Sequence, residues 1–183
     1  PVPFFPITIL TSLLKCPCAL YCRQNPVIAT SDILYIAYLH ALEEIKLYNF
    51  IKLIYRGEII QNFKMGKMEI DVYLPMLNIG FELNGIYWHS DKFKSKDYHL
   101  NKYKKSVENG ISLYTIWEDD WTLKREICES FILNKLGNSI KLMARKTILK
   151  EVNYNDSRHF LDHNHLQGDC KSSKRIGLYY NDD

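Results

Sequence analysis

The sequence predicts an α/β fold with a central mixed β-sheet flanked by helices. One observation is the order of the segments that the spacing of apolar residues predicts. This order is helix, three strands, helix, strand, helix. The other is a pair of neighbouring runs. Residues 69–74 alternate apolar and polar side chains, which is typical of a strand with one buried face. Residues 77–83 are more evenly apolar, which is typical of a central strand.

The first elements lead into a hairpin. Ser31 and Asp32 are a suitable N-cap for a helix that runs to residue 54. The core stripe expected on this helix consists of Leu42, Ile45, Phe50, Leu53 and Ile54. A strand is expected at 58–62, and the segment 64–67 turns the chain into the hairpin 69–83, whose own turn contains Pro75.

Two helices and a strand are expected after the hairpin. One helix covers 97–109 and is ended by Gly110, and its apolar side is expected at Leu100, Tyr103 and Val107. A buried strand at 111–117 follows. The next helix, 121–136, is ended by Gly137 and has acidic residues at its N-terminus, where they suit the helix dipole.

Composition divides the chain into three parts. Residues 1–30 are an N-terminal arm with Cys16, Cys18 and Cys22, whose incomplete spacing argues against a structural zinc site. Residues 31–138 form the predicted α/β domain. From residue 139 a basic strip, a strand at 147–152, a short helix and a strand at 175–180 follow. We therefore interpret 139–183 as the start of a C-terminal unit whose remainder is absent.

Charge and cysteine content narrow the class of protein only slightly. The formal charge of +3 is mildly basic, so a nucleic-acid partner has to be argued from a local patch. The apolar run 7–14 is too short to span a bilayer, and no membrane partner is expected. The five cysteines are odd in number and two are isolated, which favours a reducing, cytoplasmic location over a secreted disulfide framework.

Asp71 and Glu82 are the strongest candidates for chemistry. Both stand among apolar neighbours, at strand positions that usually hold Val or Ile. Buried carboxylates cost free energy unless they are paired, hydrogen-bonded or bound to metal. Two of them on adjacent strands predict a hydrolase that uses a divalent metal, with Mg²⁺ expected and Mn²⁺ as a substitute. The alternative is a pair of solvent-exposed strand carboxylates.

Further candidates surround this pair. His89 follows the hairpin, and His99 and Lys102 share one face of the helix 97–109. Histidine can act as general base, leaving-group acid or phosphate partner, and lysine can neutralise charge in the transition state. Glu44 is a weaker third carboxylate. For each of them the alternative is an ordinary packed or solvated side chain.

A local basic patch is a candidate for binding double-stranded DNA. Aromatic residues are interleaved with its lysines, a density that suits phosphate contacts combined with stacking. The alternative is a solvated loop. Its lysines are Lys92, Lys94, Lys96, Lys104 and Lys105.

Four segments carry a resemblance to a known family. They are Glu69–Pro75 (EIDVYLP), Glu82–Ser90 (ELNGIYWHS), Tyr98–Lys102 (YHLNK) and Ile116–Trp121 (IWEDDW). Together they resemble the endonucleases related to the very-short-patch-repair enzyme (Vsr-like). In particular they are similar to phage and intron-associated homing endonucleases with an EDxHD site, a branch of the PD-(D/E)XK superfamily. The resemblance implies a restriction-endonuclease-like core.

The resemblance also implies roles for individual residues. The central metal-binding aspartate falls on Asp71, the helix acid on Glu44 and the catalytic histidine on His89, while Leu83 stands where a backbone carbonyl faces the metal. Two positions depart from the patterns. His99 replaces the last aspartate of EDxHD, and Asn84 replaces the lysine of PD-(D/E)XK, for which Lys102 is the candidate substitute.

These observations predict a Mg²⁺-dependent DNA endonuclease that hydrolyses phosphodiester bonds with a metal-activated water. The catalytic residues expected are Asp71, Glu82, His89, His99 and Lys102, and the metal ligands expected are Asp71, Glu82 and Glu44. Two alternatives stay open. One is a nucleic-acid-binding module with the same fold and no catalysis, and the other is a mismatch-nicking DNA repair endonuclease.

Overall fold

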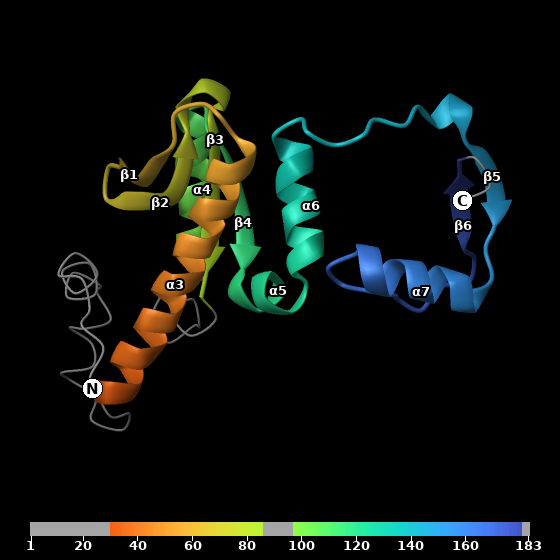
Figure 1. The fold of residues 1–183 in the computed structure, drawn as a ribbon, viewed down its shortest axis with the longest axis horizontal. Coiled ribbons are helices and arrows are strands. Elements are labelled where there is room, and N and C mark those ends of the chain that lie inside the picture. Colours follow the sequence, from red (N-terminus) through yellow and green to blue (C-terminus); the bar gives the residue numbers. More distant parts are fainter. Residues whose placement is uncertain (1–29, 86–96, 181–183) are drawn as a thin grey trace. The chain divides into compact units, whose positions relative to one another are not determined.

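A computed structural model describes residues 30–85 and 97–180 of the chain (Figure 1). The chain divides into two compact units, Pro1–Asp119 and Asp120–Asp183. The boundary expected near residue 138 falls inside the second of these units and stays a prediction. In the described residues, no helix combines the length and the apolar character needed to cross a membrane.

The first unit is built around a four-stranded mixed sheet. The strands lie in the order β1-β2-β3-β4, with antiparallel pairing of β1 to β2 and of β2 to β3, and parallel pairing of β3 to β4. The α/β fold with a mixed sheet flanked by helices is therefore confirmed. The elements are α3 (Thr30–Ile54), β1 (Ile60–Met65), β2 (Met68–Leu74), the 3₁₀ turn η1 (Pro75–Leu77), β3 (Ile79–Asn84), α4 (Tyr98–Glu108) and β4 (Ser112–Trp117), and α5 (Glu118–Leu123) begins at the end of this unit.

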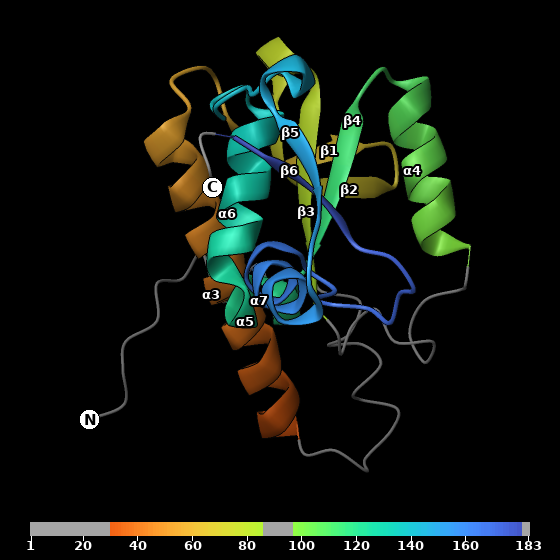
Figure 2. The ribbon, with the colours of Figure 1, turned by 90° about the vertical axis from the view of Figure 1, so that its right-hand side faces the viewer.

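Helices α3 and α4 cover opposite faces of this sheet (Figure 2). The central strand β3 is buried along its whole length, as its even apolar character predicts. On α3 the fully buried side chains are Leu47 and Ile51, one helical turn apart. The expected stripe on this helix is wrong in part, because Ile45 and Leu53 are exposed.

Three residues with positive φ show why elements of the first unit end where they do. Gly66 has φ = +66° in the turn between β1 and β2, a backbone conformation that is easily reached without a Cβ atom. Asn78 ends η1 with φ = 52°, in the left-handed region that asparagine tolerates. Gly110, with φ = +70°, ends α4, and the Ile111 N–H donates to the Ser106 carbonyl at 2.9 Å. The predicted helix stop at Gly110 is confirmed.

The buried face of α4 is polar, contrary to the expectation from its apolar residues. Lys102 and Ser106 are buried, whereas Leu100, Tyr103 and Val107 are each about half exposed. The physical reason is a charge on the sheet. Lys102 is drawn inward by the carboxylate of Glu82, which the helix pattern alone does not reveal.

The second unit contains two further helices and a two-stranded sheet, whose strands are separated in the chain by one of these helices. Strands β5 and β6 pair in antiparallel fashion. The single helix expected at 121–136 is interrupted, because Lys124 has non-helical angles (φ = −128°, ψ = 45°) and separates α5 from α6. The Lys124 ammonium donates to the carbonyl of Leu166. The elements are α6 (Arg125–Lys135), η2 (Ala144–Lys146), β5 (Ile148–Glu151), α7 (Tyr154–Asn164) and β6 (Ile176–Tyr179).

Candidate active site

The carboxylates of Asp71 and Glu82 come from neighbouring antiparallel strands. The backbone pairing of β2 with β3 ends at Val72 opposite Phe81, so Asp71 and Glu82 are one step further along the two strands. Beyond that point the Asp71 side chain takes the place of the backbone hydrogen bonds between the strands. The backbone N–H of Leu83 donates to Oδ2 of Asp71 at 2.7 Å. The hairpin thereby holds one oxygen of Asp71 in place.

Burial and neighbouring negative charge act together on Asp71. Its pKa is raised well above the usual 3.8, first by desolvation and then by repulsion from Glu82 and Glu44. The hydrogen bond from Leu83 and the charge of Lys102 lower the pKa but do not cancel these effects. The structure therefore brings three of the predicted carboxylates within electrostatic reach of one another.

Glu82 forms a buried ion pair with Lys102. The Lys102 ammonium donates to Oε2 of Glu82, and the two side chains are only 4% and 7% exposed. Since α4 supplies the lysine and β3 the glutamate, the pair joins the helix to the middle of the sheet. Lys102 therefore reaches the carboxylate pair from a separate element, as the predicted migrated lysine would have to do.

Two residues near the pair were not predicted as site residues: the sequence showed Asn84 only as a departure from the PD-(D/E)XK pattern and Tyr98 only as part of a family-like segment. Tyr98, the first residue of α4, has a raised pKa because of burial, with Lys102 lowering it and the charges of Glu82 and Asp71 raising it. Asn84 is buried, and its Oδ1 atom has no hydrogen-bond partner within the described residues. Asn84 lies two residues after Glu82 on β3 and so shares its face of the sheet.

A histidine between two carboxylates lies at the carboxyl ends of the parallel strands β3 and β4. His40 Nε2 is 3.1 Å from Glu44 Oε1, and its Nδ1 is 3.3 Å from Glu118 Oε2. Burial lowers the pKa of His40, but the two carboxylates outweigh this effect and the pKa is raised. His40 and Glu118 were missed as site residues. The spacing of His40 and Glu44, one turn apart on a helix, was the available signal.

The remaining predicted site residues have different outcomes. His89, Lys92, Lys94 and Lys96 lie outside the described residues and stay predictions. His99 packs against aromatic rings, with its centroid 5.5 Å from Tyr98 and 6.0 Å from Trp117. Lys104 is exposed. The ammonium of Lys105 lies over the β1–β2 turn, only 2.7 Å from the point where a Cβ on Gly66 would be.

The donor set of this site suits magnesium in part. In residues 30–85 and 97–180, no three His, Cys, Asp or Glu side chains are grouped so that they could hold a metal ion. Mg²⁺, however, is commonly held by one or two carboxylates and retains several waters. Asp71 and Glu82 provide such a pair, and the repulsion that raises the pKa of Asp71 is the kind that a bound cation relieves. Lys102 competes with a bound cation for the Glu82 carboxylate, so the site suits Mg²⁺ less well than two unpaired carboxylates would.

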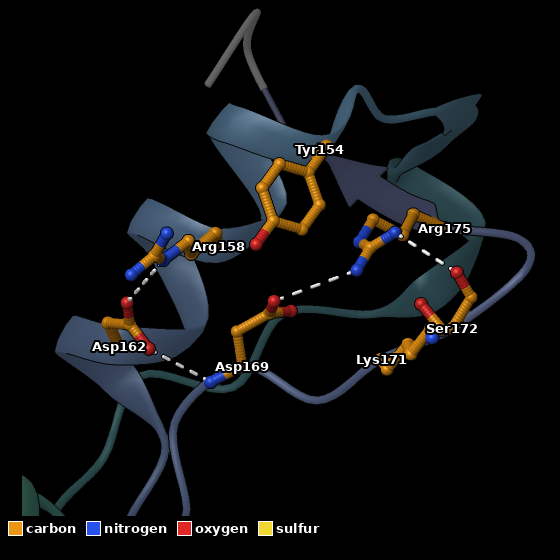
Figure 3. Close-up of a pocket in the computed structure, with 7 residues that line it drawn as sticks. All are labelled: Tyr154, Arg158, Asp162, Asp169, Lys171, Ser172 and Arg175. Atoms are coloured by element: carbon orange, nitrogen blue, oxygen red, sulfur yellow. Dashed lines mark hydrogen bonds and ion pairs between the residues drawn. The ribbon is translucent and has the colours of Figure 1, made fainter.

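The second unit contains a separate polar cavity of about 660 Å³ (Figure 3). One side of it is the face of α7 that carries Tyr154, Arg158 and Asp162. Its charges largely compensate one another: Arg158 pairs with Asp162 at 3.4 Å and Arg175 with Asp169 at 3.6 Å. The Asp169 N–H also donates to Asp162 at 2.9 Å, which lowers the pKa of Asp162. These contacts fasten the loop after α7 to that helix.

Comparison with known proteins adds no further support for a function. The chain matches no protein-family model, no curated protein and no solved structure.

Proposed function

We propose that this chain is a Mg²⁺-dependent DNA endonuclease with a restriction-endonuclease-like core, of the kind found in homing endonucleases. The observation that carries the proposal is the convergence of Asp71 and Glu82 from adjacent strands, with Lys102 reaching them from α4. Phosphodiester hydrolysis needs negative groups that hold a cation and a positive group near the phosphate, and these side chains are of those kinds.

Each side chain has a distinct part in this proposal. Asp71 and Glu82 would hold the cation, and the hydrogen bond from the Leu83 N–H fixes one oxygen of the Asp71 carboxylate. A bound Mg²⁺ supplies Lewis acidity toward the phosphate and toward water. The Lys102 ammonium would then interact with the oxygens of the phosphate as well as with Glu82. His89, outside the described residues, is proposed as the general base or the acid that faces the leaving group.

The test is cleavage of supercoiled plasmid DNA in Mg²⁺. We expect Asp71→Asn, which keeps the shape of the side chain, to reduce cleavage by about two orders of magnitude or more, because the cation loses a charged ligand. Glu69→Gln is the matched control, since Glu69 lies on the same strand and pairs with Lys64 outside the site. Cleavage by Asp71→Asn at the wild-type rate would refute the proposal.

One observation favours a second candidate, a DNA-binding module without catalysis. The buried ion pair with Lys102 already satisfies Glu82 and so offers an alternative to a metal at that carboxylate. The two candidates differ in the plasmid assay. Nicking by the wild type that is abolished by a chelator excludes the binding-only protein, whereas DNA binding without any nicking in Mg²⁺ or Mn²⁺ supports it.

A further inference from the structure

The carboxyl ends of the two parallel strands meet at His40. Gly85 directly follows β3 and Glu118 directly follows β4, while His40 comes from the middle of α3. The register places Asn84 opposite Trp117, so the two following residues lie side by side at this edge. Functional groups of open α/β sheets gather at such carboxyl ends. The His40 contacts are thus part of the edge at which the candidate active site lies.

The backbone at Gly85 is packed closely against the side chains of His40 and Glu118. A Cβ atom on Gly85 would be 3.0 Å from Oε2 of Glu118 and 3.0 Å from Nδ1 of His40. Such distances are shorter than about nine in ten real Cβ contacts, so Glu118 and His40 would have to shift by a few tenths of an ångström. The imidazole is therefore enclosed by the backbone after β3 on one side and by Glu118 on another, and its side chain is only 14% exposed. Its position in the fold is well defined.

The carboxylate of Glu44 takes a defined position only if a neighbour such as His40 restrains it. Its side chain is 35% exposed and belongs to a residue type with many rotamers, so its carboxylate would otherwise sample several positions. The contact between His40 Nε2 and Glu44 Oε1 restrains one of its oxygens. The charge of Glu44 is close enough to Asp71 to contribute to its raised pKa, so the restrained carboxylate belongs to the same electrostatic cluster as the proposed metal ligands.

We infer that His40 is a positioning residue, which holds Glu44 toward the cation that Asp71 and Glu82 bind and is itself held by Glu118. This inference rests on the proposed function. It extends the site by two residues, His40 and Glu118, that lie beyond the expected ligand set. Partners of this kind orient metal ligands, and their loss typically lowers metal affinity by about 10- to 100-fold.

The test measures Mn²⁺ affinity by electron paramagnetic resonance of the intact chain, with thermal unfolding as a check that each variant is folded. We expect His40→Ala to weaken Mn²⁺ binding by about tenfold. His40→Gln should recover part of this loss, because its amide nitrogen can take the place of Nε2 and donate to Glu44. His40→Asn, whose amide lies nearer the place of Nδ1, should recover none. His159→Ala, on α7 of the second unit, is the matched control and should bind as the wild type does.

A double-mutant cycle separates positioning from a direct effect of charge. Because Glu118 acts through His40, Glu118→Gln should weaken Mn²⁺ binding in the wild type and have no further effect in His40→Ala. Wild-type affinity in folded His40→Ala would overturn the inference while leaving the proposed function intact, and so would independent effects of the two substitutions. Weakened binding in His40→Ala, together with a wild type that cleaves no DNA, would overturn the proposed function alone. A wild type that binds no Mn²⁺ would overturn both.

Discussion

At the scale of single residues, the chemistry of the site is set by competition for charge around Asp71. Its carboxylate is largely shielded from water, lies near Glu82 and Glu44, and accepts one backbone hydrogen bond from Leu83. A proton on Asp71 and a divalent cation beside it relieve the same repulsion. Cation binding should therefore weaken as the pH falls through the raised pKa of this group.

The raised pKa of Asp71 also predicts how stability depends on pH. In the folded state the pKa lies above the usual 3.8, so the folded protein holds this proton more tightly than the unfolded chain does. The ionised carboxylate therefore costs stability at neutral pH, and the cost fades as the pH falls toward 3.8. In the presence of a chelator, we expect Asp71→Asn to raise the unfolding midpoint at neutral pH by about 2 °C or more.

The measurement is thermal unfolding of the two proteins between neutral and acidic pH. The advantage of Asp71→Asn should shrink steadily as the solution is acidified. Glu69→Gln, on the same strand, should show no such trend. A variant that is less stable than the wild type at every pH would contradict the assignment of Asp71 as a carboxylate under repulsion.

At the scale of elements, α4 is attached to the sheet through charge as well as apolar contact. Its buried residues are Lys102 and Ser106, and its apolar residues Leu100, Tyr103 and Val107 are exposed to about half their area. The Ser106 hydroxyl donates a hydrogen bond to the Lys102 carbonyl within the helix, at 2.9 Å, so it is satisfied without a partner on the sheet. The ion pair with Glu82 therefore matters for docking of the helix.

Removing the lysine should destabilise the first unit strongly. Lys102→Met leaves the buried Glu82 carboxylate without its charge partner, and loss of one member of a buried pair costs about 3–5 kcal/mol. Lys104→Met, two residues along the same helix and exposed, should change stability by no more than about 0.5 kcal/mol. Urea denaturation followed by circular dichroism gives both values.

Replacing both Glu82 and Lys102 by neutral residues tests whether the unpaired buried charge causes the loss of stability. In Glu82→Gln combined with Lys102→Met no charge is left buried, so this protein should be more stable than Lys102→Met alone. If Lys102→Met unfolds at the same urea concentration as Lys104→Met, the pair has no role in holding α4 to the sheet.

At the scale of the whole molecule, the chain consists of two compact units with different content. The first contains the mixed sheet and all described residues of the candidate active site, and the second contains α6, α7 and the β5–β6 pair. Within the second unit, residues 138–143 between α6 and η2 belong to no helix or strand, and Ile140 is 90% exposed.

This irregular segment should be the preferred site of limited proteolysis among the described residues. Trypsin needs an extended, accessible backbone, and Lys141 is exposed within such a stretch. We expect its first cut there to be at least about tenfold faster than at Lys135, which lies within α6. Mass spectrometry of the early fragments identifies the cut.

Chymotrypsin provides a control with another specificity, since Leu142 and Met143 are exposed in the same segment. Early cuts by both enzymes at 141–143 would also support a domain boundary close to residue 138. An earliest cut within 60–85 would contradict this description of the chain.

Sequence alone determined the features that depend on local pattern. The alternation in 69–74, the even apolar character of 77–83 and the glycine at position 110 predict strands and a helix end because they reflect burial and backbone conformation residue by residue. The positions of Asp71 and Glu82 among apolar neighbours likewise indicated a carboxylate pair. Such signals lie within a few residues of the element that they describe.

Only the tertiary structure decided which side chains meet across elements. The inward turn of Lys102 depends on Glu82, twenty residues away in the chain, and it reverses the buried face that the helix pattern predicts. The contact of His40 with Glu118 depends on the parallel pairing of β3 with β4, which brings distant residues to one edge. Ion pairs between separate elements leave no periodic trace in a sequence, because a charge is buried wherever its partner lies. The carboxylate pair could be predicted from its apolar surroundings. Lys102 was predicted as a lysine that neutralises charge, but its burial and its ion pair with Glu82 were not, and the contact of His40 with Glu44 was not expected at all.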